Sequence, residues 1–449
     1  MRLTNFLSGV RALADSSRVP DPTVKTMDKQ GLDADVIIIG GGPAGATLGC
    51  LLALGDHKAI VVERSAHPRE HVGELLTPSI NAILHRIGLL HRVDNAGFRR
   101  RNGVGWTTPG AQLLKIPVAD YPPPRALRRY GFSVERDAFD ALLLQRAREL
   151  GVEVLEQTAA RRVVFQKDRA VGVEVQQPGG RIKRLTGRFI VDASGRCSLL
   201  GRQLGLVHRD SRLRQCAFYA WFRDVEPSLN GSDDYAFLHR LGRWREWGWQ
   251  IPLRDGVTSI GVVTSCDHLQ AAIEDRDAYF GCAIDQNRIF ERAMASAQRI
   301  SPWRMVGDYS YRLQRLHGSG WLLVGDASGF IDPIFSSGVD IAMYSSVFGY
   351  ESMLPLLLLG RWNEADEDFA MSKFEQRLRR GVALWAHAVD LFYGSPRRLR
   401  RLANQPAAIA AVCRFLQGNP YELQNELIIQ ELLDSIGQQN RGDQYNVFN

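Results

Sequence analysis

The chain has 449 residues, 45% of them hydrophobic, so it can bury a large core shared among two or three closely packed units. Its net charge is +7, and because only seven of the 56 basic residues are lysine, arginine carries the excess. Neither arginine cluster, at 99–101 or 397–401, alternates with stacking aromatic residues, so nucleic acid is not an expected partner. No apolar run is long enough to predict membrane insertion.

The six cysteines are scattered, without C-x-x-C or metal-ligand spacing. This predicts a reduced, cytoplasmic location and no metal site. Residues 1–18 carry an apolar stripe at helical spacing, typical of an amphipathic helix that packs on the body or docks to a partner. A linker at 19–22 follows it.

Residues 35–64 form the strongest local pattern. A short β-branched strand at 36–39 runs into Gly40, Gly42 and Gly45, which have G-x-G-x-x-G spacing, and a helix follows at about 44–54. A second strand at 59–62 ends in Glu63, eighteen residues after Gly45 and placed to bind a ribose. The pattern predicts a dinucleotide-binding βαβ unit whose helix N-terminus faces a pyrophosphate, with FAD favoured over NAD. Pro43, Ala44 and Arg64 belong to the same predicted cofactor site.

A loop at 67–78 follows and contains Arg69, His71 and Gly73. It resembles the R-x-x-V-G-E-S-L-x-P segment of flavin-dependent halogenases and the related class A flavoprotein monooxygenases. The resemblance implies that this loop covers the isoalloxazine ring, with Arg69 and Gly73 in the cofactor site. It also implies that Arg136, at the start of a helix that runs to about residue 150, contacts FAD. Alternatively, Arg136 is a solvated first-turn arginine.

Two later segments extend the resemblance. A buried strand ends at Asp192 in a D-x-S-G-R element, and another leads into Gly325-Asp326 and the D-P-x-F-S-S-G turn at 332–338. Asp326 is placed to accept a hydrogen bond from a ribityl hydroxyl. The free N–H groups of the helix that follows can face the flavin or a small anion. We therefore expect a cofactor role for a further set of residues, namely Asp192, Asp326, Pro333, Ser336, Ser337, Gly338 and Val339.

Residues 213–300 contain four predicted strands, expected to form the floor of a substrate chamber. Trp247 and Trp249 match the W-x-W-x-I-P signature of halogenases and share one strand face with Ile251. They are predicted either to contact substrate or to pack in the core. The sequence thus indicates an α/β fold: a Rossmann-like FAD-binding domain of the p-hydroxybenzoate hydroxylase type, an interleaved β-sheet substrate domain and a helical C-terminal region.

The expected boundaries are 1–30 for the N-terminal helix and linker, 31–212 with 301–352 for the FAD-binding domain, 213–300 for the substrate domain and 353–449 for the helical region.

One departure from the family affects the expected chemistry. Halogenases of carrier-tethered pyrroles and phenols have a lysine just before a W-T dipeptide, and here Arg101 stands there. A guanidinium offers only donors and stays protonated, so it should not form a haloamine.

The resulting hypothesis is an FAD-dependent monooxygenase that hydroxylates an electron-rich aromatic ring through a C4a-hydroperoxyflavin. A protein-tethered ring, such as a peptidyl tryptophan in tryptophylquinone biogenesis, is the expected substrate. Arg101 would orient it, and His71 is a candidate acid or base or else a structural loop histidine. The alternatives are a halogenase of a carrier-tethered pyrrole or phenol, and an FAD-binding escort protein with little turnover. NAD(P)H or a separate flavin reductase would supply electrons.

Overall fold

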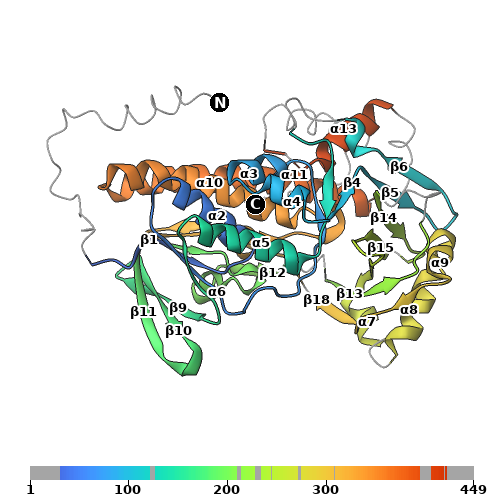
Figure 1. Ribbon diagram of the computed structural model, residues 1–449, viewed down its shortest axis with the longest axis horizontal. Coiled ribbons are helices and arrows are strands. Elements are labelled where there is room, and N and C mark those ends of the chain that lie inside the picture. Colours follow the sequence, from blue (N-terminus) through green and yellow to red (C-terminus); the bar gives the residue numbers. More distant parts are fainter. Residues whose placement is uncertain are drawn as a thin grey trace.

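The computed structural model describes residues 31–121, 127–209, 214–227, 234–243, 245–271, 275–307, 309–394, 406–418 and 420–421. It confirms the predicted α/β class, with a mainly parallel sheet and an antiparallel sheet at opposite ends of the long axis (Figure 1). The predicted N-terminal helix, the linker and the arginine cluster at 397–401 lie outside the described residues.

The parallel sheet has the strand order β21-β11-β1-β2-β8; β1, β2 and β21 are apolar and almost wholly buried, whereas β8 at the edge is partly exposed. These strands are β1 (Ala34–Ile39), β2 (Ala59–Val62), β8 (Glu153–Leu155), β11 (Ile182–Asp192) and β21 (Trp321–Leu323). Antiparallel strands β9 (Ala159–Gln166), β10 (Arg169–Gln176) and β20 (His317–Gly318) extend it. Since β1 pairs in parallel with both β2 and β11, the carboxyl ends of all three strands meet at one edge, where the glycine turn lies.

Three helices pack beside this sheet, with the first in contact with the other two: α2 (Pro43–Leu54), α5 (Arg136–Glu149) and α10 (Gly338–Leu359). Helix α2 is apolar on nearly every side, because α5 and α10 both contact it. Within the described residues, α10 alone is long and apolar enough to cross a membrane, and 67% of its most apolar window is buried inside the protein, as in a core helix.

The antiparallel sheet has the order β17-β13-β16-β15-β14-β5-β6, with β18 paired to β13. Its strands are β5 (Gly103–Thr107), β6 (Leu113–Ile116), β13 (Gln215–Arg223), β14 (Tyr235–Arg240), β15 (Trp247–Pro252), β16 (Thr258–Ser265), β17 (Gln298–Arg299) and β18 (Arg304–Gly307). The four strands predicted within 213–300 are present, and strands from before and after that range join them. The boundary prediction did not include these additions.

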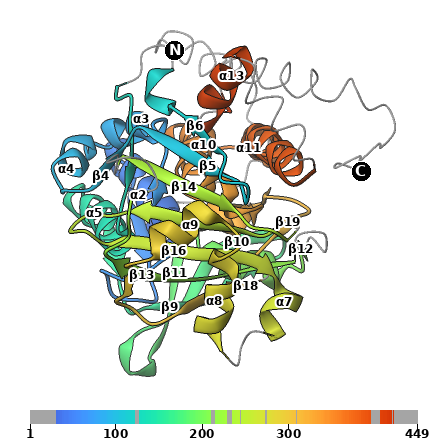
Figure 2. The same cartoon turned by 90° about the vertical axis from the view of Figure 1, so that its right-hand side faces the viewer.

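The short sheets and the remaining helices surround these two sheets. β3 (Leu75–Leu76), β4 (Arg99–Arg101) and β7 (Gly131–Ser133) form one short sheet, and β12 (Val207–Arg209), β19 (Tyr311–Leu313) and β22 (Gly329–Phe330) form another. The helices are α3 (Ile80–Arg86), α4 (Leu90–Asp94), α6 (Leu199–Gln203), α7 (Cys266–Ala271), α8 (Arg276–Ile284), α9 (Arg288–Met294), α11 (Glu364–Gly394) and α13 (Pro406–Leu416). Figure 2 shows α11 and α13 on one side of the antiparallel sheet and α7 and α8 at its far end.

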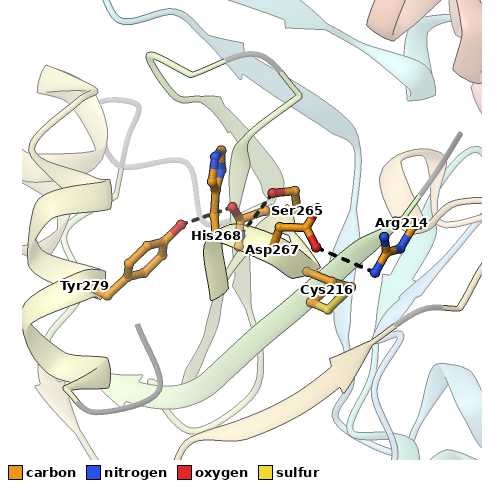
Figure 3. The surroundings of a disulfide bond; sticks show 8 residues. Arg214, Cys216, Ser265, Asp267, His268 and Tyr279 are labelled. Carbon is orange, nitrogen blue, oxygen red and sulfur yellow. Dashed lines mark hydrogen bonds and ion pairs between the residues drawn. A yellow bond between two sulfur atoms is a disulfide. The ribbon is translucent and has the colours of Figure 1, made fainter. Parts of the chain in front are cut away.

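One expectation about the cysteines was wrong. Cys216 and Cys266 form a disulfide (Figure 3), although their spacing suggested only reduced thiols. The two residues are 50 positions apart, and the antiparallel pairing of Gln215 in β13 with Ser265 in β16 brings them together. An ion pair of 3.6 Å between Arg214 and Asp267 lies beside the disulfide. The described residues contain no group of three or more His, Cys, Asp or Glu side chains that could hold a metal ion.

Candidate functional site

A cavity of about 830 Å³ lies where the carboxyl edge of the parallel sheet faces the antiparallel sheet. Most of the predicted site residues line it, namely Gly40, Gly42, Pro43, Ala44, Glu63, Arg64, Arg69, His71, Gly73, Arg136, Trp247, Trp249, Asp326, Pro333, Ser336, Gly338 and Val339. Gly45, Arg101, Asp192 and Ser337 do not line it. Segments far apart in the sequence therefore converge on one elongated site.

The glycine turn between β1 and α2 requires its glycines. Gly40 has a φ of 109°, and a Cβ there would lie 2.3 Å from the Ala193 carbonyl oxygen. A Cβ on Gly45 would lie 1.9 Å from the Gly40 carbonyl oxygen, so Gly45 allows the turn to close on the helix without lining the cavity. Gly42 is the N-cap of α2, where free N–H groups face the cavity.

Glu63 does more than end its strand. The carboxylate is 4% exposed and accepts hydrogen bonds from the N–H groups of Gly41, at 2.7 Å, and Ser65, at 2.9 Å. Arg69 lies 3.8 Å from it and also close to Gly42. This places a buried carboxylate and a guanidinium at the end of the cavity predicted to hold the ribose and pyrophosphate.

Arg136 is buried and holds the 71–73 loop in place, so it is not a solvated first-turn residue. Its guanidinium makes paired hydrogen bonds of 2.9 and 3.0 Å to Asp140 and donates to the carbonyl oxygens of Val72, at 2.8 Å, and Gly73. Burial and the nearby Arg136 lower the pKa of His71 to about 4, so its imidazole is neutral at neutral pH. His71 Nδ1 also contacts the Val72 carbonyl oxygen at 2.7 Å, as a structural loop histidine would.

The turn before α10 supplies the opposite wall. Ser336 has a φ of 55° and with Gly338 and Val339 presents the start of α10 to the cavity, while Ser337 is the N-cap and is buried behind them. Asp326 also lines the cavity, and burial raises its pKa to about 6 against the opposing effects of Arg196 and Arg136. A helix N-terminus beside a carboxylate of this kind suits the polar edge of a flavin.

Asp192 and Arg101 lie behind the cavity wall. The Asp192 carboxylate accepts the N–H groups of Ser194, at 2.9 Å, and Leu200, at 2.7 Å, and thereby shapes the D-x-S-G-R turn. Arg101 is 4% exposed and donates to the Leu76 carbonyl oxygen at 3.1 Å. Burial lowers its pKa to about 10, opposed by the charge of Asp340, so it stays cationic near neutral pH.

Glu74, which was not among the predicted site residues, lines the cavity between the flavin loop and the antiparallel sheet. Glu74 is 2% exposed, and its carboxylate accepts the Ser259 hydroxyl at 3.0 Å and the Gly73 N–H at 3.3 Å. The Ser259 hydroxyl accepts the Trp249 indole N–H at 3.1 Å, and burial raises the pKa of Glu74. The sequence does show an acidic residue in the V-G-E pattern of the flavin loop. No spacing rule, however, predicts that this residue contacts Ser259.

A second buried network supports Trp247. Its indole N–H donates to the Tyr393 hydroxyl at 2.9 Å, and that hydroxyl donates to Asp332 at 3.2 Å. Burial raises the pKa of Asp332 to about 7. Trp247 and Trp249 are therefore both cavity walls and parts of a packed aromatic cluster, with ring centroids 6.0 Å apart. The two interpretations left open for these tryptophans are compatible.

The residues present fit FAD: the glycine turn leaves room for a pyrophosphate, Glu63 and Arg69 flank it, and the N-terminus of α10 lies at the other end of one cavity. The fold and the site define a flavin-dependent enzyme of the oxidoreductase type.

Residues 111–401 match the family model described as tryptophan halogenase. The chain is also 32% identical, over 87% of its length and 90% of the relative's, to a 1H-pyrrole-2-carbonyl-[peptidyl-carrier protein] chlorinase of Pseudomonas fluorescens. The chain belongs to the tryptophan halogenase family.

Other relatives agree. A 1H-pyrrole-2-carbonyl-[peptidyl-carrier protein] brominase of Pseudoalteromonas luteoviolacea is 29% identical over 70% of this chain and 75% of its own. Among solved structures, the flavin-dependent brominase Bmp2 superposes with a TM-score of 0.80 at 25% identity, covering 91% of this chain and all of its own. The myxobacterial chondrochloren halogenase CndH superposes with a TM-score of 0.75 at 27% identity, covering 90% of this chain and 96% of its own. These likenesses confirm the predicted resemblance to flavin-dependent halogenases and the predicted cofactor, FAD.

Proposed function

We propose that this protein is a flavin-dependent halogenase that acts on an electron-rich, pyrrole-type ring presented on a carrier protein. The observation that carries the proposal is the near full-length similarity to a chlorinase of a carrier-bound pyrrole, together with a cavity that joins the flavin loop to a wall of tryptophans. Halogenation replaces hydroxylation of a peptidyl tryptophan as the first proposal, because the relatives named above are halogenases.

Bound FAD would supply the oxidising equivalents derived from O2. The chain holds the cofactor with the glycine turn, Glu63 and Arg69, and excludes water with the 71–77 loop. Trp247 and Trp249 hold the ring, and their indole N–H groups are tied to Tyr393 and Ser259. Each tryptophan therefore has a fixed position at the substrate end of the cavity.

Glu74 is the proposed proton acceptor. Electrophilic substitution leaves a proton on the attacked ring carbon, and a base must remove that proton to restore aromaticity. Glu74 faces the same cavity as both tryptophans, and its raised pKa makes the carboxylate a better proton acceptor than an exposed one. This role replaces His71, whose pKa of about 4 makes it a weak base.

A second candidate, hydroxylation of the ring, is favoured by one observation. The cavity lining contains no lysine among the described residues, and the position where carrier-dependent halogenases have a lysine holds Arg101, behind the wall. A protonated guanidinium accepts no electrophilic halogen. Direct oxygen transfer to the ring requires no such group. For both halogenation and hydroxylation, the proposal includes the predicted domain boundaries and a cytoplasmic location. It also includes NAD(P)H or a separate flavin reductase as the electron donor.

The deciding experiment is mass spectrometry of a pyrrolyl-carrier thioester after turnover with FAD, a flavin reductase, NADH, O2 and excess bromide. A mass gain from bromine on the ring supports halogenation. A gain of oxygen that is independent of bromide supports hydroxylation. Two controls test for reaction in free solution. One omits this protein and keeps the reductase, and the other adds a phenol to the full reaction to trap free hypobromite. If the carrier substrate gains neither atom while flavin is oxidised, the carrier-tethered pyrrole is the wrong substrate.

A further inference from the structure

A second, smaller cavity of about 240 Å³ adjoins the flavin cavity. Its wall is formed by the D-x-S-G-R turn, by α6 with the strand that follows it, and by the segment that joins β18 to β19. β12 and β19 are paired strands of one short sheet and lie together beside β18 (Figure 2). Arg196 and Tyr309 line both cavities, so the two spaces meet at these side chains.

The smaller cavity is strongly basic. Arg196, Arg202 and Arg209 line it, and its described lining contains no aspartate or glutamate. Arg202 Nε donates to the Cys197 carbonyl oxygen at 2.8 Å, and among the described residues its terminal guanidinium nitrogens have no hydrogen-bond acceptor. Arg202 and Arg209 are exposed, whereas Arg196 is partly buried and also acts on the Asp326 carboxylate, so the three guanidinium groups together give this space a positive potential that favours an anion.

Tyr309 supplies the independent observation. Its side chain is 3% exposed, and its hydroxyl has no hydrogen-bond partner among the described residues. The neighbouring Tyr311 differs, since its hydroxyl donates to the Asp326 carbonyl oxygen. A buried hydroxyl without a partner is unusual in a folded protein, and an oxygen of a bound ligand is a suitable acceptor for it.

We propose that this cavity binds the phosphate of a ligand whose other end reaches the flavin cavity. Arginine guanidinium groups bind phosphate oxygens through paired, charge-assisted hydrogen bonds, and the Tyr309 hydroxyl adds a neutral donor. A phosphopantetheine arm and a nicotinamide dinucleotide both carry such a group on an extended chain. The first source rests on the proposed carrier-tethered substrate, whereas the second does not, so the phosphate site stands independently of halogenation.

The test is a binding measurement on the FAD-loaded protein and needs no turnover. Isothermal titration would compare 4′-phosphopantetheine, NADPH and inorganic pyrophosphate as probes, with dephosphorylated pantetheine as the matched ligand lacking phosphate. The variants are Arg202→Gln, Arg209→Gln and Tyr309→Phe. The control is Arg312→Gln, because Arg312 is exposed on β19 and does not line the cavity.

Loss of one arginine should weaken the binding of the phosphorylated probe about tenfold or more, and Tyr309→Phe several-fold, with Arg312→Gln unchanged. The probe that binds identifies the source of the phosphate. The proposal is overturned if neither phosphorylated probe binds more tightly than pantetheine, or if the cavity variants bind like Arg312→Gln. If a variant fails to fold, the test uses the wild-type protein, on which pyrophosphate should compete with 4′-phosphopantetheine or NADPH for binding. Absence of competition overturns the proposed phosphate site.

Discussion

Asp332 offers the sharpest test of the electrostatics around the cavity. Its carboxylate is 2% exposed and accepts the Ile334 N–H at 2.9 Å and the Tyr393 hydroxyl at 3.2 Å. Burial raises its pKa from 3.8 to about 7. Asparagine has nearly the same shape and can keep both hydrogen bonds through its oxygen, but it cannot ionise. Asp332→Asn therefore changes the titration of this site with little change in its packing.

The sign and size of the effect follow from linkage. Because the folded state holds the proton of Asp332 more tightly than the unfolded state, the stabilisation is fully present below the unfolded pKa of 3.8 and is lost as pH rises through about 7. Each pH unit inside that window costs about 1.4 kcal/mol. Between pH 5 and pH 8 this carboxyl should therefore lower the stability of the wild-type protein by about 2 to 3 kcal/mol, an effect that the variant lacks.

Urea unfolding at pH 5 and pH 8, with equal FAD occupancy, measures the difference. Between pH 5 and pH 8, Asp332→Asn should gain about 2 to 3 kcal/mol of stability relative to wild type. Asp326 and Asp340 also have raised pKa values, but they titrate in both proteins and cancel in the comparison. Asp368→Asn, at an exposed position of α11, controls for the loss of one charge. An equal stability difference between variant and wild type at both pH values would refute the reasoning.

Four further predictions concern the site and the fold. Glu74→Gln should lower kcat at least about 10²-fold with little effect on KM if Glu74 accepts the ring proton, and an unchanged kcat in steady-state assays excludes that role. Arg101→Lys should leave the ratio of brominated to oxygenated product unchanged in mass spectrometry, because position 101 lies behind the cavity wall, whereas a rise in bromine incorporation would mean that this position selects the reaction. Gly45→Val should abolish FAD binding, seen as loss of flavin absorbance in the purified protein, because even a Cβ would lie 1.9 Å from a backbone oxygen. Cys216→Ser should lower the unfolding free energy by about 4 kcal/mol, the chain-entropy value for a loop of this length. Equal midpoints for both proteins in denaturant would contradict that contribution.

The cofactor half of the site was predictable because its signals are local. Gly40, Gly42 and Glu63 act through a turn and two adjacent strands, and their spacing alone defines the geometry. The turn before α10 is equally local, since Ser336 and Gly338 lie at the start of the helix they open. Short-range patterns of this kind have few alternative structures, so the sequence is sufficient to place them.

The polar networks were not predictable because they join distant segments. Glu74 meets Ser259 across 185 positions, and Asp332 meets Tyr393 across 61. Each contact depends on how the antiparallel sheet docks on the flavin loop and on α11, which no residue pattern specifies. The disulfide of Cys216 has the same origin, since it depends on the register of two antiparallel strands.

Arg101 shows why position in a motif and position in a site are separate questions. The motif aligns it with a catalytic lysine, yet its guanidinium donates to the Leu76 carbonyl oxygen and faces Asp340. Asp340 in turn accepts the hydroxyls of Thr77 and Ser79, so this buried cluster ties β4 and the flavin loop to the first turn of α10. Removing the charge would leave Asp340 without its cation, which is costly in a buried site. Arginine at this position therefore has a structural role, and the chemistry of the cavity falls to the groups that line it, with Glu74 first among them.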